Sequence, residues 1–260
     1  MSEQLNPKWK TVWIVGGSTG IGRELALAMD GGVDHVAVSA RSEDTLSALA
    51  TGSKSLAAYP LDVSDKDAVK ACVTAIEATA GPIDLAVLSA GAWKLMDAAE
   101  LDLAAVRTGI EVNYMGVMHA LDALLPGMLA RGRGHIAIVA SVAGYRGLPR
   151  SIAYGPTKAA LINLAEILRC ELAPRGITVS LVNPGFVDTP MTRDNPFPMP
   201  GMIPASVAAQ ALLKGLMRER YEIVFPFGFV MAMKLLGILP NAVYFWLVNN
   251  VMMRGLARGR

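Results

Sequence analysis

The sequence predicts an α/β protein with a doubly wound parallel sheet of about seven strands and helices on both faces. Short apolar, β-branched runs alternate along the chain with longer segments of helical period. The runs are hydrophobic almost throughout, as expected for strands that are buried on both sides. Turn residues such as Gly81-Pro82 separate several of these elements.

The expected strands, in chain order, are Thr11–Val15, His35–Ala40, Ser55–Leu61, Ile83–Ser89, His135–Ala140, Ile177–Val182 and Tyr221–Phe225. The segments of helical period between them include Ile21–Met29, Asp65–Ala80, Leu103–Arg131 and Tyr154–Ala173. Helical crossovers join parallel strands, so these elements are expected to build one sheet. Because no internal repeat or low-complexity linker interrupts them, we expect a single domain over residues 1–225.

Residues 226–260 have a different character and are predicted to form an apolar helical extension. From Ile223 onward the chain has no acidic residue and four basic ones, Lys234, Arg254, Arg258 and Arg260. The uncharged stretch Leu235–Met253 is nominally long enough to span a bilayer, but Gly237, Pro240 and three Asn residues interrupt it. We therefore expect two short helices divided at Pro240. They lie on a membrane surface, cover the substrate cleft, or pack against the core or a second subunit.

The composition excludes several classes of function. A formal net charge of +2 is too balanced for a protein that binds nucleic acid by neutralising phosphates. Cys72 and Cys170 lie in apolar, helix-like stretches without metal-ligand spacing, which favours a reduced, cytoplasmic protein. His35, His119 and His135 have no metal partners at useful spacing either, so they are interpreted as structural and no metal is expected. The polar N-terminus gives no sign of a signal peptide.

A glycine-rich loop follows the first strand and opens the first helix. Its spacing, Gly-x-x-x-Gly-x-Gly, differs from the best-known dinucleotide fingerprint, and such loops also occur for purely structural reasons. Glycines at this place allow a tight turn and let backbone N–H groups approach a pyrophosphate at the helix N-terminus. Its position in the first strand–helix unit favours a Rossmann-type dinucleotide site, with contacts from Gly16, Ser18, Thr19, Gly20, Ile21 and Gly22.

The residue after the second strand indicates which dinucleotide is bound. An acidic residue there would hydrogen-bond the 2′-hydroxyl of NAD and repel a 2′-phosphate, but this chain has Arg41 and no carboxylate before Glu43. Arg41 can form a charge-assisted pair with a 2′-phosphate. We therefore expect NADP(H) rather than NAD(H), the alternative being that Arg41 is an ordinary solvated arginine.

Three residues form a candidate catalytic set. Tyr154 and Lys158 open a helix four residues apart and so share one of its faces. A cation about 5 Å from the phenol, at an effective dielectric of about 20, would lower the pKa of Tyr154 from about 10 to about 8, which suits a general acid/base. Ser141 ends the fifth strand, where its hydroxyl can hydrogen-bond the carbonyl oxygen that Tyr154 protonates. Each residue has an ordinary explanation by itself, and the combination carries the inference.

The order of these motifs resembles that of the short-chain dehydrogenases/reductases. The resemblance extends from about Thr11 to Phe225 and rests on Gly16, Gly20, Gly22, Asp62, Val63, Ala90, Gly91, Asn113, Ser141, Tyr154, Lys158 and Asn183–Thr189. It implies an oxidoreductase that transfers a hydride between NADP(H) and a carbonyl or secondary alcohol, and a homodimer or homotetramer. Val15 and Ser89 depart from the usual Thr and Asn of the family, which concerns hydrogen bonds of the scaffold and leaves the catalytic set complete.

The resemblance also implies roles for individual residues. Tyr154 is the general acid/base, and Lys158 lowers its pKa while binding the nicotinamide ribose. Ser141 orients the substrate, and Asn113 holds a water in a proton relay through Lys158. The implied cofactor contacts further include Asp62 and Val63 beside the adenine, Ala90 and Gly91, and Pro184, Gly185, Val187 and Thr189 beside the nicotinamide.

The substrate pocket is expected to be apolar, with residues 190–202 as a short lid. Its candidate residues are mostly aromatic or sulfur-containing, namely Trp93, Leu95, Ser141, Tyr145, Phe186, Met191, Phe197, Met199 and Met202. They favour a hydrophobic lipid, steroid-like or aromatic substrate, the alternative being that they simply pack the fold. Two other functions stay open: a non-enzymatic NADP(H)-sensing regulatory or scaffold protein, and a lipid-binding protein at a membrane surface. The complete catalytic set favours the enzyme.

Overall fold

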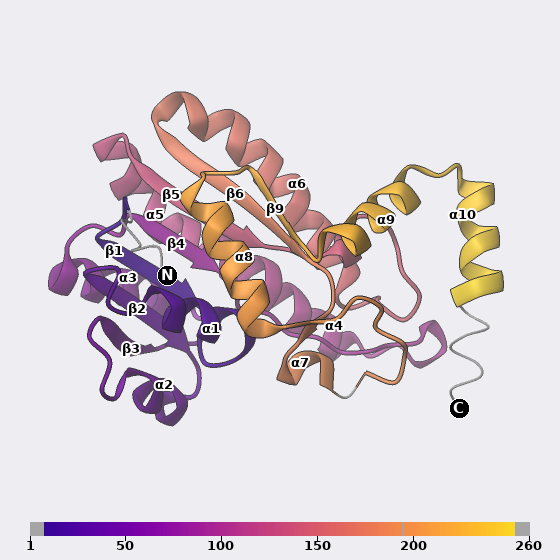
Figure 1. Cartoon of the computed structure of the whole chain (residues 1–260), viewed down its shortest axis with the longest axis horizontal. Helices are drawn as coiled ribbons and strands as arrows, with labels where there is room; N and C mark the ends of the chain where they lie inside the picture. The colour runs from indigo at the N-terminus through magenta and orange to yellow at the C-terminus, as the bar shows by residue number, and fades with distance from the viewer. Residues whose placement is uncertain (1–7, 194, 253–260) are drawn as a thin grey trace.

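The computed structural model describes residues 8–193 and 195–252. Its centre is a seven-stranded sheet in the order β3-β2-β1-β4-β5-β6-β9, in which every neighbouring pair is parallel (Figure 1). The strands are β1 (Thr11–Val15), β2 (His35–Ala40), β3 (Leu56–Pro60), β4 (Leu85–Leu88), β5 (Gly134–Val139), β6 (Ile177–Pro184) and β9 (Glu222–Phe225). The predicted fold class is confirmed, and all seven predicted strands are present with small differences at their ends.

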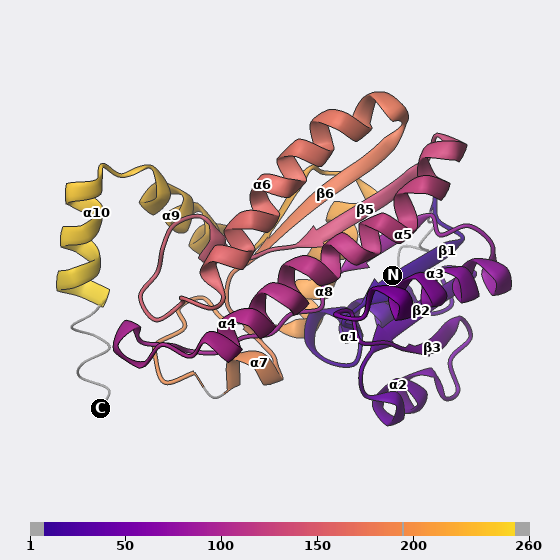
Figure 2. The ribbon, with the colours of Figure 1, turned by 180° about the vertical axis from the view of Figure 1, so that it is seen from behind.

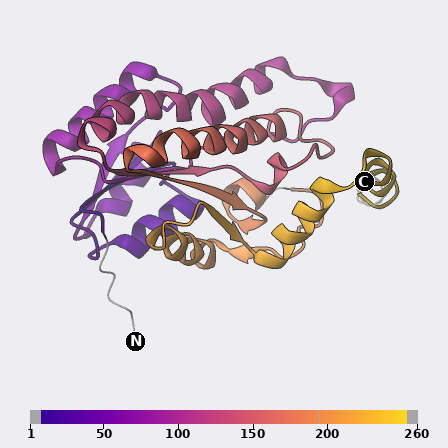
Figure 3. The same ribbon diagram turned by 90° about the horizontal axis from the view of Figure 1, so that it is seen from above.

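Helices cover both faces of this sheet, as the view from above shows (Figure 3). They are α1 (Gly20–Met29), α2 (Glu43–Ala50), α3 (Lys66–Ala80), α4 (Leu103–Ile110), α5 (Gly116–Arg131), α6 (Gly155–Leu172) and α8 (Ala205–Met217). One hydrophobic core lies between the sheet and α3, α5 and α6, and a second lies between the sheet and α1 and α8. Successive residues of β1 point to opposite faces of the sheet. Trp13 and Val15 pack in the first core, and Val12 and Ile14 pack in the second.

The predicted helical segment Leu103–Arg131 is divided in the structure. A π-helical turn, Glu111–Met115, separates α4 from α5 and carries Asn113. Such turns are rare and frequently occur at functional sites. A single helical period over the whole segment could not predict this local change in the hydrogen-bond pattern.

After β6 the chain makes an excursion before it returns to the sheet. It pairs β7 (Val187–Asp188) with β8 (Ile203–Pro204), and the short helix α7 (Pro190–Arg193) lies between them. The parallel pair closes the expected lid segment, residues 190–202, into a loop. This loop is therefore anchored at both ends beside the carboxyl edge of the sheet.

The C-terminal extension forms two helices, α9 (Phe227–Ile238) and α10 (Asn241–Leu247), which divide at Pro240 as predicted. Val230 and Met233 of α9 pack against Val142, which follows β5. Figures 1 and 2 show α10 beyond α9, away from the sheet. Within residues 8–193 and 195–252, no helix is both long and apolar enough to cross a membrane. Arg254, Arg258 and Arg260 lie outside the described residues.

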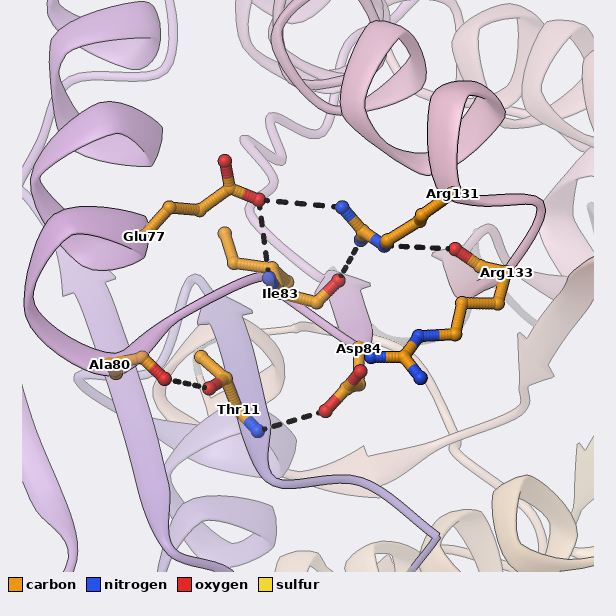
Figure 4. Close-up of polar contacts among 7 residues, drawn as sticks. All are labelled: Thr11, Glu77, Ala80, Ile83, Asp84, Arg131 and Arg133. Carbon is orange, nitrogen blue, oxygen red and sulfur yellow. Dashed lines mark hydrogen bonds and ion pairs between the residues drawn. The ribbon is translucent and has the colours of Figure 1, made fainter.

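The amino edge of the sheet is held by a polar network around Arg131 (Figure 4). Arg131 Nη2 donates to the carbonyl of Ile83 at 2.5 Å, and its Nη1 lies 3.7 Å from Glu77 Oε1. Asp84 Oδ2 accepts from the backbone N–H of Thr11 at 3.3 Å. These contacts join the end of α5 and the α3–β4 turn to the start of β1. They fix the edge opposite the one where parallel sheets bind ligands.

Candidate active site

The predicted cofactor residues gather at the carboxyl edge of the sheet. A Cβ on Gly16 would lie 2.6 Å from the backbone N of Ala90, so the glycine loop after β1 touches the segment after β4. A Cβ on Gly20 would lie 2.9 Å from Thr189 Cγ2, so the same loop also touches the segment after β6. Only glycine permits these approaches. Three sequence segments that are far apart in the chain therefore meet at one place.

The glycine loop has the shape and free hydrogen-bond donors that a pyrophosphate requires. Gly16 and Gly20 have φ angles of +85° and +57°, which residues with side chains rarely adopt. Thr19 caps α1 without a side-chain hydrogen bond in the described structure, which leaves the first N–H groups of the helix available to an anion. A Cβ on Gly22 would lie 2.4 Å from the carbonyl O of Gly16, so the loop is tightly closed. Together with Ser18 and Ile21, these residues fit a dinucleotide.

The expected adenosine contacts lie at the ends of β2 and β3. Hydrogen bonds from Ser64, and to a smaller extent the charge of Arg41, lower the pKa of Asp62. The Asp62 carboxylate and the exposed Arg41 guanidinium are therefore neighbours. The carbonyl of Val63 lies 3.0 Å from His119 Nδ1, which gives that histidine a structural partner. A guanidinium at the end of β2 is placed where a 2′-phosphate could pair with it.

Asn113 is completely buried and joins two parts of the site. Its Nδ2 donates to the carbonyl of Ala92 at 3.1 Å and to Thr157 Oγ1 at 3.0 Å, and its Oδ1 accepts from the backbone N–H of Ala92 at 2.6 Å. A Cβ on Gly91 would lie 3.6 Å from Asn113 Oδ1 and 3.9 Å from Lys158 Nζ. The π-helical turn thus braces the loop after β4 against α6. Its implied role in a water relay stays a prediction.

The three candidate catalytic residues come together as expected. Tyr154 stands at the N-cap of α6, and Lys158 Nζ lies one turn later at 5.5 Å from the centroid of its ring. Lys158 is buried and donates to the carbonyl of Val139 at 2.8 Å. Ser141 follows β5, and Trp93 packs edge-on against Tyr154 with 5.0 Å between ring centroids.

Burial sets the protonation of this pair. It raises the pKa of Tyr154 to about 12, which the Ser141 hydroxyl partly opposes, and it lowers the pKa of Lys158 to about 8. Our expectation that Lys158 lowers the pKa of Tyr154 is therefore wrong for this structure. The amine lies where the spacing predicted, but it is itself desolvated and directed at the Val139 carbonyl. At neutral pH the phenol keeps its proton.

A cavity of about 500 Å³ opens beside Tyr154 and Ser141. Six of the predicted pocket residues line it, namely Trp93, Leu95, Ser141, Phe186, Met191 and Phe197. Tyr145, Met199 and Met202 do not line it, which corrects the expectation for those three. The Tyr145 hydroxyl instead donates to Glu222 Oε1 at 2.8 Å, so β9 holds this ring away from the cavity.

The expected lid segment borders the cavity. Residues of this segment on the cavity wall are Met191, Thr192, Asn195, Phe197, Pro198 and Pro200. Asn195 Oδ1 accepts from Trp93 Nε1 at 3.0 Å, so the loop reaches across to the segment after β4. The position suits a lid, and its movement stays a prediction.

The chain matches a known family over most of its length. The family model for short chain dehydrogenases matches residues 10–197. The chain belongs to the short-chain dehydrogenase family. It is therefore an oxidoreductase, an NAD(P)-dependent dehydrogenase or reductase.

Oxidoreductases and reductases from several bacteria are similar to it. An uncharacterized oxidoreductase of Myxococcus xanthus is 34% identical over 91% of this chain and 95% of its own length. A ketoacyl reductase of Nostoc is 31% identical over 83% of this chain and 78% of its own length. A Burkholderia phymatum short-chain dehydrogenase/reductase, solved in complex with NAD, has the same fold with a TM-score of 0.79 and 23% identity, covering 89% of this chain and 93% of that one.

The sequence did not predict every part of this short-chain dehydrogenase site. Residues that line the cavity without having been predicted include Leu148, Pro149, Arg150, Ser151, Phe229 and Met233. The last two belong to α9, so one face of the C-terminal extension covers the cleft, one of the three arrangements we expected for it. The aromatic character of the extension was the sequence feature that indicated this contact with the cleft. For the segment between Ser141 and Tyr154, the sequence offered no pattern.

Proposed function

We propose that this short-chain dehydrogenase is an NADP(H)-dependent reductase of a carbonyl on a largely hydrophobic molecule, and reversibly an alcohol dehydrogenase. The observation that carries the proposal is the protonated Tyr154 phenol, which stands with Ser141 at an apolar cavity of about 500 Å³. Phe186 at this cavity packs against Phe197 and Phe229, with ring centroids at 6.0 Å and 5.2 Å. Such a wall fits an aliphatic or aromatic body better than a sugar.

The glycine loop and Arg41 would hold the pyrophosphate and the 2′-phosphate of the cofactor, and the segment Pro184–Thr189 would hold its nicotinamide. When bound, the nicotinamide supplies or accepts a hydride. Tyr154 Oη donates its proton to the carbonyl oxygen in reduction and takes it back in oxidation. The Ser141 hydroxyl donates a hydrogen bond to the same oxygen and stabilises the charge that develops there.

The raised pKa of Tyr154 means that the phenol is present in its protonated form at neutral pH. A phenol that keeps its proton at neutral pH is ready to donate it to an oxygen that becomes an alkoxide. Oxidation uses the phenolate form of the same residue, which takes the proton of the alcohol. Asn113 supports both directions by holding the β4 loop against α6.

The test is the oxidation of NADPH, followed by its absorbance, with carbonyl compounds graded from small and polar to long-chain and polycyclic. Wild type is compared with Tyr154→Phe, which retains the ring and loses the proton. Turnover of the hydrophobic members and its loss in the variant, by roughly a hundredfold or more, is the expected result. A preference for small polar members contradicts the hydrophobic substrate. Tight NADPH binding without turnover of any member supports the alternative of a sensor or scaffold protein.

We also infer that the C-terminal extension rests on an anionic membrane surface. Its helix α9 exposes Phe227, Leu235 and Ile238, with 68%, 63% and 79% of each side chain accessible. A surface helix normally turns charged residues outward, but the one charge of α9, Lys234, pairs with Glu222 of the sheet. Phe245 and Trp246 of α10 are exposed as well. With no acidic residue after Glu222 and three basic ones besides the paired Lys234, the extension complements anionic lipid.

Vesicle flotation tests this contact. Vesicles containing phosphatidylglycerol should carry the protein upward more strongly than pure phosphatidylcholine, and Ile238→Ser with Trp246→Ser should release it. Val207→Ser with Met217→Ser removes exposed apolar side chains from α8 and is the matched control. If the first pair instead converts an oligomer to a monomer without affecting flotation, a second copy of the chain covers this face. A homodimer or homotetramer, frequent among short-chain dehydrogenases, is our expectation for the assembly.

A further inference from the structure

Arg150 forms part of the wall of the apolar cavity. It is the only charged residue on the cavity wall among the described residues. Its Nε is buried and has no hydrogen-bond partner within the described structure, and no ion pair found there includes Arg150. Buried polar groups are nearly always hydrogen-bonded. Arg150 as a whole is half-buried, and its Nε–H is a buried donor that finds no acceptor in the described part of the protein.

The backbone around Arg150 is held in an unusual conformation. Its φ angle is +62°, in the left-handed region that residues with side chains adopt at a cost. The carbonyl of Arg150 accepts from the backbone N–H of Met96 at 3.0 Å, and the next residue, Ser151, caps the start of α6 through a hydrogen bond from Gly155 N at 3.1 Å. The strained residue is thus fixed from two sides, four positions before Tyr154. Strain that is held in this way concentrates at functional sites.

The rest of the cavity defines what Arg150 could bind. Its other polar groups, such as Ser141, Tyr154 and Asn195, are neutral, and most of the wall is aromatic or aliphatic. A molecule that fills the cavity is therefore apolar over most of its body. The guanidinium fork adds one requirement, because its geometry matches the two oxygens of a carboxylate.

We propose that Arg150 binds a carboxylate of the substrate and that the substrate is an amphipathic oxo or hydroxy acid. This rests on the proposed function, since the oxo or hydroxy group reacts at Tyr154. The apolar body occupies the cavity between the two groups. Arg150 acts as a specificity-determining residue and takes no part in proton or hydride transfer.

The experiment compares long-chain oxo acids with their methyl esters as substrates. Wild type should use the acid with a kcat/KM roughly ten- to hundredfold above that of the ester, as a charge-assisted hydrogen bond in a cavity provides. Arg150→Gln should abolish this ratio by raising KM for the acid alone, and Arg150→Lys should restore a part of it. Arg193→Gln removes an exposed charge of the lid segment that does not line the cavity, so it should leave the ratio unchanged.

Calorimetric titration with a saturated long-chain carboxylate provides a readout that needs no turnover. Wild type should bind it, and Arg150→Gln should bind it roughly tenfold or more weakly while retaining wild-type thermal stability. If no carbonyl is reduced but this difference in binding is found, the proposed function fails and the carboxylate site stands. Equal use of acid and ester by wild type, or an effect of Arg150→Gln on KM for NADPH alone, overturns the inference.

Discussion

Lys158→Met should change how the stability of the protein depends on pH. Lys158 is buried with 3% of its surface accessible, and its ammonium has one backbone partner, the carbonyl of Val139. Burial lowers its pKa from 10.5 to about 8. The unfolded chain therefore binds more protons than the native protein between these two pH values. The sign follows directly: the free energy of unfolding rises with pH across this window.

The size of the effect follows from the same two pKa values. Each pKa unit corresponds to about 1.4 kcal/mol, so the difference between 10.5 and about 8 amounts to about 3 kcal/mol. Below pH 8 Lys158 is charged in both the folded and the unfolded state, so burying the charge lowers the free energy of unfolding by this full amount. Above pH 10.5 Lys158 is neutral in both states, and this destabilisation is absent. Methionine has nearly the same shape and no charge, so Lys158→Met lacks this destabilisation at every pH.

The assay is guanidinium unfolding of wild type and Lys158→Met at a series of pH values from 8 to 10.5. The variant's stability relative to wild type should decrease by about 3 kcal/mol across the series, because other titrating groups are common to both proteins. Lys70→Met, which removes an exposed ammonium, is the matched control. A stability difference that stays constant over the whole series would refute the reasoning, since the pKa of Lys158 would then be the same in the folded and the unfolded protein.

Three further changes test other parts of the site. Arg41→Ala should raise KM for NADPH roughly tenfold or more and leave KM for NADH nearly unchanged in steady-state kinetics; equal effects would mean that Arg41 does not read the 2′-phosphate. Gly185→Ala would place a Cβ 2.7 Å from Phe229 Cδ1 and should lower the free energy of unfolding by roughly 1–3 kcal/mol, which Phe229→Leu should recover. Asn113→Leu leaves the N–H and carbonyl of Ala92 unpaired and should lower the free energy of unfolding, measured with guanidinium, by roughly 2–4 kcal/mol. If activity is lost while this free energy is unchanged, Asn113 acts in the chemistry alone.

The sequence predicted the sheet well because each strand can be identified from its own short stretch of residues. Each strand of this parallel sheet is buried on both faces, so its sequence is a continuous apolar run. Such a run can be found without knowing which strands lie beside it. The glycine loop and the Tyr154–Lys158 pair are local in the same sense, since a turn and one helical face fix them. For these features, short stretches of sequence carry nearly all of the structural information.

Features that depend on contacts between distant segments could not be predicted in this way. Tyr145 follows Ser141 closely in sequence, yet Glu222 of β9 accepts a hydrogen bond from its hydroxyl and keeps it out of the cavity. Arg150 belongs to no motif, and only the assembled structure shows that it lines the cavity and that its buried Nε has no hydrogen-bond partner among the described residues. The pKa of Tyr154 has the opposite shift to the expected one for a similar reason. Spacing gives the distance to Lys158, but desolvation depends on what covers both groups.

The C-terminal extension is tied directly to the loop that follows Ser141. Arg146 of this loop donates to the carbonyl of Gly237 at 3.0 Å and to Asn241 Oδ1 at 2.6 Å, and its guanidinium lies 3.9 Å from the centroid of the Tyr244 ring. The carbonyls at the end of α9 would otherwise lack partners, so this one side chain caps α9 and joins it to α10. The loop from Ser141 to Arg150 is thus held by α6 at its end and by the extension along its length. A membrane contact that moves α9 and α10 would act on the loop that carries both the candidate catalytic serine, Ser141, and the proposed carboxylate site.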